Sequence, residues 1–350
     1  MTIFHPLARH EGGRHVITTY GAGKRLRVRT VHVPFRPPFS YALDPLVAMG
    51  LPRVDVWFGF NPLACARGLV TRAAGRARTV VLWSVDFTPD RFGHGRLLTR
   101  AYDRFDRLCC LHADARIELS EAAREARDAR HDIRGDGAPT YIVPMGTWLA
   151  RLPRTARDGF DRKRVVFLGQ LVRGKGVELL LDALARLDVE AEIVGGGPLE
   201  EDVRRRAAEL GDRIHVHGFV PDHRQVEHIL AGSSIAVAPY APDENTYTRW
   251  ADPGKLKDYL AAGLPIVLTD VPHNAEELAQ RAGAELVEYD AAAIADAISR
   301  GLASPDRWRG RREAALRYAQ RFDWSTLLPE LLEQIGAQRR ARSLSPRTKP

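Results

Sequence analysis

The stretch Arg164–Pro198 (RVVFLGQLVRGKGVELLLDALARLDVEAEIVGGGP) constrains the fold of this chain more than any other part of its sequence. It opens with an apolar, strand-like run that stops at Gly169, continues as a basic loop, and then repeats apolar residues at helical spacing. A second strand-like run, AEIVG, follows the helix. Because two parallel strands need a crossover helix between them, the stretch predicts a βαβ unit of a parallel sheet.

The loop Gln170–Gly176 in this stretch is a candidate anion site. Open α/β sheets bind ligands where the carboxyl end of a strand meets the amino end of a helix, and amide hydrogens and the helix dipole favour an anion there. Arg173 and Lys175 would add positive charge. The loop is neither a P-loop nor a G-x-G-x-x-G dinucleotide turn. The alternative is an ordinary turn with basic residues on its surface.

Composition and charge narrow the class of protein. A chain of 350 residues is comfortable for two domains. The formal charge of +8 suggests an anionic partner such as a nucleotide diphosphate, anionic lipid or nucleic acid. Since the charge is dispersed and no basic face is interleaved with aromatic residues, we expect no specific nucleic-acid binding. Part of the charge lies in residues 337–350, which we predict to be a disordered basic tail.

Cysteine usage and hydropathy predict where the protein works. Cys65, Cys109 and Cys110 have no metal-binding spacing, and two adjacent cysteines do not readily supply a disulfide framework, which favours a reducing cytoplasm. No apolar run approaches the ~18 residues of a membrane span, and no signal peptide is visible. We therefore expect a cytoplasmic protein without a transmembrane segment.

Strand-like and helix-like segments alternate from residue 28 to residue 120, which predicts an α/β first domain over residues 1–145. Gly12 and Gly13 precede a helix-like segment over residues 15–26. Such a glycine pair lets a substrate approach the backbone closely, or it forms a plain turn. Residues 146–162 carry no clear periodicity and are predicted to be a linker.

Asp86 is a candidate catalytic residue of this first domain. It follows the strand-like run TVVLW, which ends at Trp83. A carboxylate at the carboxyl end of a strand could act as a base or orient a hydroxyl group. The alternative is that Asp86 caps the next turn through a local hydrogen bond to the backbone.

A basic amphipathic helix is predicted over residues 95–111. Its apolar face carries Leu97, Leu98, Ala101, Phe105 and Leu108, and Arg96, Arg100, Arg104 and Arg107 lie beside that face. Such a helix can lie on anionic lipid, which would place the protein peripherally at the inner face of the membrane. The alternative is that the helix packs on its own sheet with its arginines in water.

The strand–helix alternation resumes after residue 198. His215 and His217 lie on one face of a predicted strand, and we interpret them as strand residues because a metal site would need further ligands. A helix is predicted to begin after Pro253, with Lys255 and Asp258 on one face of its first turns. The cation and the helix dipole suit a diphosphate, and the carboxylate suits ribose hydroxyls. The alternative is an exposed ion pair between Lys255 and Asp258.

Three motifs occur in an order and spacing similar to those of GT-B glycosyltransferases, most of all the retaining family four. They are FLGQLVRGKGVELLLDAL, VHGFVPDHRQVEHILAGSSIAVAPY and DPGKLKDYLAAGLPIVLTD. The resemblance covers residues 163–336, while in the first domain only DVWFGFNPLA and WSVDFTP look familial. It implies an α/β fold of two Rossmann-like domains facing a central cleft. The donor domain would span 163–305, and helices over 306–336 would cross back to the first domain.

The resemblance also implies donor-binding roles for individual residues. Lys175 would bind the leaving diphosphate, and Lys255 would touch phosphate or the donor sugar. Gly218, Phe219 and Val220 would hold the nucleobase, mainly through their backbone. Asp258 matches the second acid of the family's Glu-x7-Glu motif and would bind ribose hydroxyls. Gly12 and Gly13 would face the diphosphate from the other domain.

Two positions depart from the family pattern. The arginine that follows the strand glycine in the family is Gln170 here, so Arg173 would substitute for it or that contact would be missing. The first acid of the Glu-x7-Glu motif falls at Trp250, where the family makes a donor-sugar contact.

The predicted function is transfer of a sugar from a nucleotide-diphosphate donor to a hydroxyl of a polysaccharide, lipid-linked or metabolite acceptor. The resemblance implies retention of configuration, and we expect no cofactor and no metal because cations and amides can stabilise the charge on the leaving β-phosphate. Asp86 would orient or deprotonate the acceptor. Two alternatives stay open. One is a GT-B nucleotide-sugar epimerase, and the other is a catalytically silent nucleotide-sugar-binding homologue.

Overall fold

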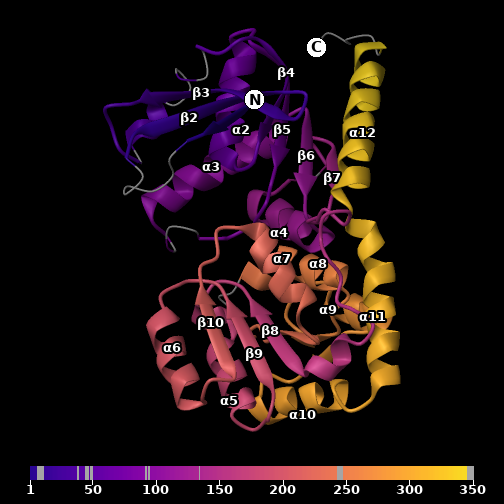
Figure 1. The fold of residues 1–350 in the computed structure, drawn as a ribbon. Helices are drawn as coiled ribbons and strands as arrows, with labels where there is room; N and C mark the ends of the chain where they lie inside the picture. Colours follow the sequence, from indigo (N-terminus) through magenta and orange to yellow (C-terminus); the bar gives the residue numbers. More distant parts are fainter. Residues whose placement is uncertain are drawn as a thin grey trace. The chain divides into compact units, whose positions relative to one another are not determined.

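A computed structural model describes residues 1–5, 12–37, 39–43, 47, 50–90, 93, 95–133, 135–242 and 247–344 (Figure 1). The chain divides into two compact units. Unit 1 comprises Met1–Glu118 and Arg124–Ile142, and unit 2 comprises Leu119–Ala123 and Val143–Pro350. The main boundary, after Ile142, lies close to the predicted end of the first domain at residue 145.

Unit 1 is built on a parallel sheet of four strands in the order β4-β5-β6-β7. The strands are β4 (Val54–Gly59), β5 (Ala77–Trp83), β6 (Ala115–Glu118) and β7 (Thr140–Ile142), and the helices that connect them are α2 (Pro62–Ala73), α3 (Leu97–His112) and α4 (Glu121–His131). Consecutive strands are neighbours and each pair is joined by a helix, so the predicted strand–helix alternation is confirmed from residue 54 onward. Cys65, Cys109 and Cys110 are buried in this unit and unbridged.

The predicted helix-like segment over residues 15–26 is wrong. The structure has an antiparallel sheet of β1 (Thr2–Phe4), β2 (Arg14–Gly21) and β3 (Lys24–His32) instead. Ala22 and Gly23 turn the chain with φ angles of 47° and 76°, the left-handed conformation that two-residue hairpin turns require. The β-branched and aromatic residues of β2 also favour a strand. The basic edge strand β3 is exposed along almost its whole length.

Unit 2 contains a parallel sheet of six strands in the order β10-β9-β8-β11-β12-β13. The strands are β8 (Arg164–Leu168), β9 (Glu190–Val194), β10 (Ile214–Gly218), β11 (Ile235–Ala238), β12 (Ile266–Thr269) and β13 (Glu285–Val287). Their spatial order reverses between β8 and β11, because the chain first builds outward from β8 on one side and then on the other. Ligands of open α/β sheets bind at the carboxyl ends of the strands beside such a reversal.

Helices cover both faces of this sheet (Figure 1). One core packs α5 (Val177–Leu184), α6 (Glu200–Glu209) and α10 (Ala291–Gly301) against alternate strand residues such as Val165 and Phe167. The other packs α7 (His223–Ala231), α8 (Gly254–Ala262), α9 (Ala275–Ala282) and α11 (Pro305–Ala319) against residues such as Val166. Burial on both faces explains the nearly continuous apolar strands. Both units are Rossmann-like, as predicted.

Two predicted boundaries are wrong. Residues 146–162 are not a free linker, because Leu152 and Thr155 are buried and the Thr155 amide donates to the Ala262 carbonyl at 2.8 Å. Helix α12 (Trp324–Leu344) continues through the first part of the predicted disordered tail, where AQRRARSL consists mostly of good helix formers. The rest of the tail, 345–350, lies outside the described residues. Helices α11 and α12 belong to unit 2, and their crossing to the first domain stays a prediction.

Candidate functional site

The carboxyl ends of β8, β9 and β10 are joined by main-chain contacts between glycine-rich loops. The Leu171 amide donates to the Gly196 carbonyl at 3.0 Å, and the Gly195 amide donates to the Gly218 carbonyl at 2.9 Å. A Cβ atom on Gly195 would lie 1.8 Å from the Gly169 oxygen. On the other side of the strand reversal, a Cβ atom on Gly176, whose φ is 70°, would lie 1.8 Å from the Pro239 oxygen. Main-chain atoms of the glycine-rich loops therefore pack directly against one another at this edge of the sheet.

Two lysines converge at this edge over one aromatic ring. Lys175 comes from the loop after β8, and Lys255 comes from the first turn of α8. Their Nζ atoms lie 5.0 Å and 4.6 Å from the centroid of the Tyr240 ring, and Lys255 Nζ also lies 4.5 Å from that of Phe167. Lys175 Nζ is 3.4 Å from Thr248 Oγ1. The structure thus brings together the two predicted phosphate ligands.

One of the two lysines, Lys255, lacks a hydrogen-bond partner for its ammonium group among the described residues. Burial lowers the pKa of Lys175, and burial together with the charge of Lys175 lowers the pKa of Lys255 well below its ordinary value. The buried ammonium of Lys255 and the half-buried Lys175 beside it are together suited to an anion that carries more than one negative charge.

The other residues predicted around the donor lie at different places. Gln170 and Arg173 are exposed, and no contact between either side chain and the two lysines is recorded among the described residues. Gly218 has a φ of 73°, and a Cβ atom there would lie 2.7 Å from Glu200 Oε1. Phe219 beside it is 76% exposed, so its ring is accessible for stacking. Val220 packs against the core of unit 2.

Asp258 does not pair with Lys255 in the described structure, so the alternative of an ion pair between them is wrong there. Its Oδ1 instead accepts a hydrogen bond from Thr147 Oγ1 at 2.9 Å. Burial raises the pKa of Asp258 to about 6, against the lowering effects of the Thr147 hydrogen bond and of His223. The carboxylate and the lysine pair therefore have separate surroundings within unit 2.

Gly12 and Gly13 lie at the start of β2 in unit 1. A Cβ atom on Gly13 would lie 2.0 Å from the Val33 oxygen, so the close approach of the hairpin backbone already requires glycine there. Gly12 has a φ of 67° and open space around it. The turn interpretation thus has a structural basis, and their contact with a diphosphate stays a prediction. In unit 2, the main-chain oxygen of Trp250 accepts a hydrogen bond from Ser120 Oγ at 3.1 Å.

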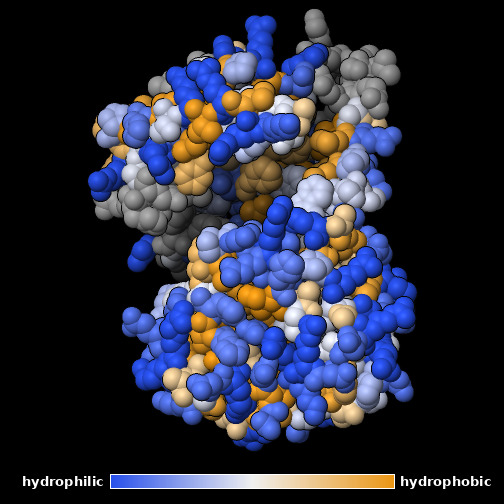
Figure 2. Space-filling model, viewed as in Figure 1, coloured by the Kyte–Doolittle hydropathy of each residue, from blue (hydrophilic) through white to orange (hydrophobic). Residues whose placement is uncertain are grey.

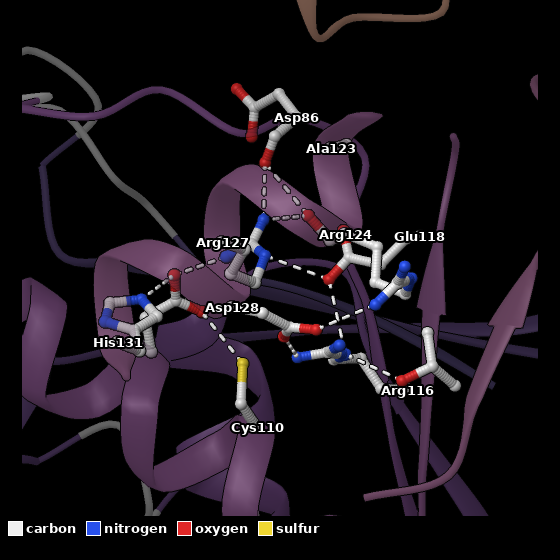
Figure 3. A network of polar contacts seen from close by, with 12 residues as sticks. Asp86, Cys110, Arg116, Glu118, Ala123, Arg124, Arg127, Asp128 and His131 are labelled. Carbon is white, nitrogen blue, oxygen red and sulfur yellow. Dashed lines mark hydrogen bonds and ion pairs between the residues drawn. The ribbon is translucent and has the colours of Figure 1, made fainter. Parts of the chain in front are cut away.

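Asp86 follows β5 in a loop whose backbone is fixed by a buried arginine (Figure 3). The Asp86 main-chain oxygen accepts hydrogen bonds from Arg127 Nη2 at 3.1 Å and from Ser84 Oγ at 2.9 Å. Arg127 also donates to Ser84 Oγ. Asp86 itself is half-buried at the carboxyl edge of the unit 1 sheet.

Arg127 belongs to a network of buried charges beneath this loop (Figure 3). It pairs with Asp106, and its Nε lies 2.9 Å from Glu118 Oε1. His131 Nε2 lies 2.9 Å from Asp106 Oδ2, and Arg116 Nη1 lies 2.7 Å from Asp128 Oδ1. Burial raises the pKa of Glu118 despite the two arginines. Although burial opposes it, Arg127 and His131 lower the pKa of Asp106.

Sequence reasoning missed several of these residues. Tyr240, Phe167 and Thr248 were not singled out, although Tyr240 lies two residues after β11 and Phe167 lies near the end of β8. Position at the carboxyl ends of neighbouring strands was the signal that could have found both. Arg127 was not singled out either.

One histidine of β10, His217, is satisfied within the sheet, as expected. Its Nε2 lies 2.6 Å from Glu192 Oε2 on the neighbouring strand, while His215 is exposed. In the described ranges, no group of three or more His, Cys, Asp or Glu side chains is placed to hold a metal ion.

The predicted apolar face of α3 is exposed rather than packed. Leu97 is 80% exposed and Leu98, Phe105 and Leu108 are also exposed, whereas the helix packs inward through Thr99, Asp106, Cys109 and Cys110. Figure 2 shows apolar side chains among hydrophilic ones on the visible face of unit 1. The expectation that this face packs on its own sheet is therefore wrong. Across the described residues, no helix has both the length and the apolar character needed to cross a membrane.

Comparison with known proteins matches the second unit to a family. The family model described as "Glycosyl transferases group 1" matches residues 162–304. The GDP-mannose-dependent alpha-(1-6)-phosphatidylinositol monomannoside mannosyltransferase of Mycolicibacterium smegmatis is 31% identical over 203 residues, covering 52% of this chain and 50% of that protein. The alpha-maltose-1-phosphate synthase of the same organism is 27% identical over 198 residues, covering 51% and 49%. The chain thus spans about half the length of these curated relatives.

Solved structures match both units. Sucrose-phosphate synthase from Thermosynechococcus elongatus has a TM-score of 0.66 at 22% identity and covers 86% of this chain and 78% of its own. HepE from Anabaena, solved in complex with UDP, has a TM-score of 0.66 at 18% identity and covers 85% and 82%. At these sequence identities the structural match establishes the fold alone. Residues 162–304 are therefore a glycosyl transferases group 1 domain, in a chain with the GT-B fold of two Rossmann-like domains that resembles glycosyltransferase family four.

Proposed function

We propose that this protein is a glycosyltransferase that moves a sugar from a nucleotide-diphosphate donor to a hydroxyl of a polysaccharide, lipid-linked or metabolite acceptor. The observation that carries the proposal is the convergence of Lys175 and Lys255 over Tyr240 at the strand reversal of unit 2. Burial of the Lys255 ammonium without a hydrogen-bond partner among the described residues is costly unless an anion neutralises it, and a nucleotide diphosphate has the required charge.

The proposed chemistry follows from this electrostatic arrangement. Cleavage of the bond between sugar and diphosphate leaves negative charge on the β-phosphate. Lys175, Lys255 and the loop amides would stabilise that charge where it develops, without a metal or a cofactor. Asp86 would orient or deprotonate the acceptor hydroxyl. Retention of configuration is part of the proposal and rests on the resemblance to family four.

The nucleobase is an open choice in this proposal. One relative is named for a GDP-mannose donor, and HepE was solved with UDP. Gly218 and the exposed ring of Phe219 would contact the base through backbone and stacking, which read few base-specific groups. A screen of several nucleotides is therefore the right first experiment.

The test is a thermal-shift screen against UDP, GDP, ADP and dTDP and their common sugar conjugates. A ligand that binds the folded state raises the melting temperature by mass action. We expect a shift with one nucleotide that is lost in Lys175→Ala and kept in Arg186→Ala, which removes an exposed cation elsewhere in unit 2. The absence of a shift with every nucleotide would contradict the donor site.

Turnover separates the transferase from the two alternatives. Release of free nucleotide that depends on an added acceptor supports transfer, and acceptor-independent sugar isomerisation would indicate an epimerase. Binding without any turnover would indicate a silent homologue. The role of Asp86 has its own test, because an Asp86→Asn variant with wild-type kcat would exclude that residue as the acceptor base.

We also propose that unit 1 docks on anionic lipid, which would bring the enzyme to a lipid-linked acceptor. The exposed leucines of α3 lie beside Arg96, Arg100, Arg104 and Arg107, and apolar insertion combined with cationic attraction is what holds interfacial helices on membranes. The exposed, basic strand β3 of the same unit carries Leu26 among its arginines and would add to this attraction.

Flotation with anionic and neutral vesicles tests this docking. We expect recovery with anionic vesicles that falls with added salt and in Leu97→Glu, but not in Val70→Glu, which alters an exposed apolar residue of α2. Equal recovery with both vesicle types would contradict the proposal.

A further inference from the structure

The loop that follows β5 is held by contacts that converge from one side. Ser84 is buried, and its amide donates to the Ile117 carbonyl of the neighbouring strand at 2.9 Å. Its hydroxyl donates to the main-chain oxygen of Asp86 at 2.9 Å. Phe87 is buried as well, so the two residues nearest to Asp86 with inward side chains anchor the loop.

Arg127 touches this loop at three points. Its Nη2 donates both to Ser84 Oγ and to the Asp86 main-chain oxygen, the latter at 3.1 Å. Its guanidinium carbon lies 4.9 Å from the centroid of the Phe87 ring. The Ser84 hydroxyl, Arg127 Nη2 and the Asp86 carbonyl are thus joined pairwise by three hydrogen bonds, and Figure 3 shows Arg127 beside the Asp86 carbonyl. The other two nitrogens of Arg127 hold Asp106 and Glu118.

Stability alone is a weak reason for such an arrangement. Removing paired charges from water costs about as much as their attraction returns, so apolar residues of similar volume would hold α3, α4 and β6 together at least as well. A guanidinium held by acidic groups on its other nitrogens has a fixed direction for its remaining donor. In Arg127, ion pairs with Asp106 and Glu118 hold two nitrogens, and the third, Nη2, donates to the main-chain oxygen of Asp86.

We propose that Arg127 is a positioning residue that fixes the backbone of Ser84–Phe87 and thereby orients the Asp86 carboxylate toward the acceptor. This inference rests on the proposed function. Arg127 is buried beneath the loop, and we assign it no contact with substrate. Displacement of a reacting group by about 1 Å can cost 100-fold in rate, so loosening this loop should reduce turnover without changing donor binding in unit 2.

The network offers a matched control for the test. Arg116 is equally buried and pairs with Glu118 and Asp128, and its Nε donates to Thr140 Oγ1 at 3.1 Å, but none of its recorded contacts reaches the loop. Arg127→Lys keeps the charge near Asp106 and Glu118 and loses the forked contacts to the loop. Arg116→Lys makes the same change elsewhere in the network. Ser84→Ala removes the bridging hydroxyl with little expected effect on stability.

The first measurement is amide hydrogen exchange of the peptide covering residues 84–90 in the full chain, which needs no substrate. We expect faster exchange in Arg127→Lys and Ser84→Ala than in wild type and in Arg116→Lys. Melting temperatures of all four proteins, measured alongside, check that each is folded. Unchanged exchange in both loop variants, or the same increase in Arg116→Lys, would overturn the proposal. This result does not depend on whether the protein is a transferase.

The second measurement is release of UDP from UDP-glucose and of GDP from GDP-mannose, with water as acceptor. We expect Arg127→Lys to lower kcat by about 10- to 100-fold with little change in KM. Combined with Asp86→Asn, it should lower kcat no further, because residues that act through one group are not additive. Additive losses would overturn positioning through Asp86. Absence of nucleotide release by wild type, both with water and with an added hydroxyl acceptor, would contradict the proposed function on these donors, while the exchange result would still stand.

Discussion

The carboxyl edges of the two parallel sheets satisfy their polar groups in opposite ways. In unit 1, the buried charges around Arg127 are paired with one another, and their contacts end on the backbone of the Asp86 loop. In unit 2, the edge is made of glycine backbone, and Lys255 Nζ has no hydrogen-bond partner among the described residues. The two edges are therefore suited to different roles. The paired charges of unit 1 fix the geometry of a loop, whereas the lysines of unit 2 are positive charges that an anion can neutralise.

The largest expected effect comes from breaking the paired edge. Arg127→Met would take from the buried Asp106 and Glu118 the cation that they share, and loss of one partner of a buried ion pair costs about 3–5 kcal/mol. Urea unfolding of the whole chain measures this. A loss in the free energy of unfolding below about 1 kcal/mol would mean that Arg127 is not paired with Asp106 and Glu118 in solution.

Lys255→Met should have the opposite effect on the other edge. It removes a buried cation that has no acceptor, so we expect the free energy of unfolding to rise by about 1–3 kcal/mol while nucleotide binding is lost. Because the pKa of Lys255 is lowered in the folded state, wild-type stability should rise with pH toward the ordinary lysine pKa, and this rise should shrink in the variant. Thermal unfolding with and without nucleotide checks both points, and destabilisation by Lys255→Met would contradict the comparison.

Asp258 extends the comparison to a negative charge in unit 2. Its pKa is raised by burial to about 6, so the folded state binds the extra proton and stability falls as pH rises from about 4 through 6. The difference between the folded and the ordinary pKa of Asp258 lowers the free energy of unfolding at neutral pH by on the order of 2–3 kcal/mol. Asp258→Asn should remove this fall and raise the melting temperature at pH 7.5 but not at pH 4.5. Equal pH profiles for the two proteins would show that the carboxylate is better solvated than the structure indicates.

The smallest effects concern the glycine backbone. Gly176→Ala combines a left-handed φ with a collision against the Pro239 oxygen, and we expect a loss of about 2 kcal/mol together with weaker nucleotide binding. Gly23→Ala in the hairpin of unit 1 has a similar φ and open space around it, and should cost about 1 kcal/mol with binding unchanged. Chemical unfolding and the thermal-shift screen compare the pair. Similar losses would mean that the edge of unit 2 tolerates side chains.

The sequence allowed most of unit 2 to be predicted and much less of unit 1. Apolar runs that end in glycine, such as VVFLG before Lys175, and the Gly263 stop after α8 carry their structure locally. The hairpin of β2 and β3 was missed because its turn, Ala22-Gly23, lies inside a stretch that also has helix-compatible spacing. Helix α12 runs past its predicted end because a basic composition does not by itself prevent a helix.

Individual residues of the candidate site could be predicted from the sequence, but the contacts between them could not. Lys175 and Lys255 were named from their motifs, but their shared ring, Tyr240, is brought to them only by the strand order of the sheet. Asp86 was named from its place after a strand. Its support by Arg127 links residues far apart in the chain through tertiary contacts, which local patterns do not encode.

The contact between Gly176 and Pro239 has a consequence for how such chains diverge. Any side chain at residue 176 would collide with the main-chain oxygen of residue 239, which every amino acid carries, so no substitution at residue 239 removes the need for glycine at residue 176. Lys175 and Lys255 are under no such steric constraint, because each can be replaced by another residue without moving the backbone. Over evolutionary time the glycines should therefore outlast the cations, and homologues that handle other donors should be recognisable by the spacing of their glycines.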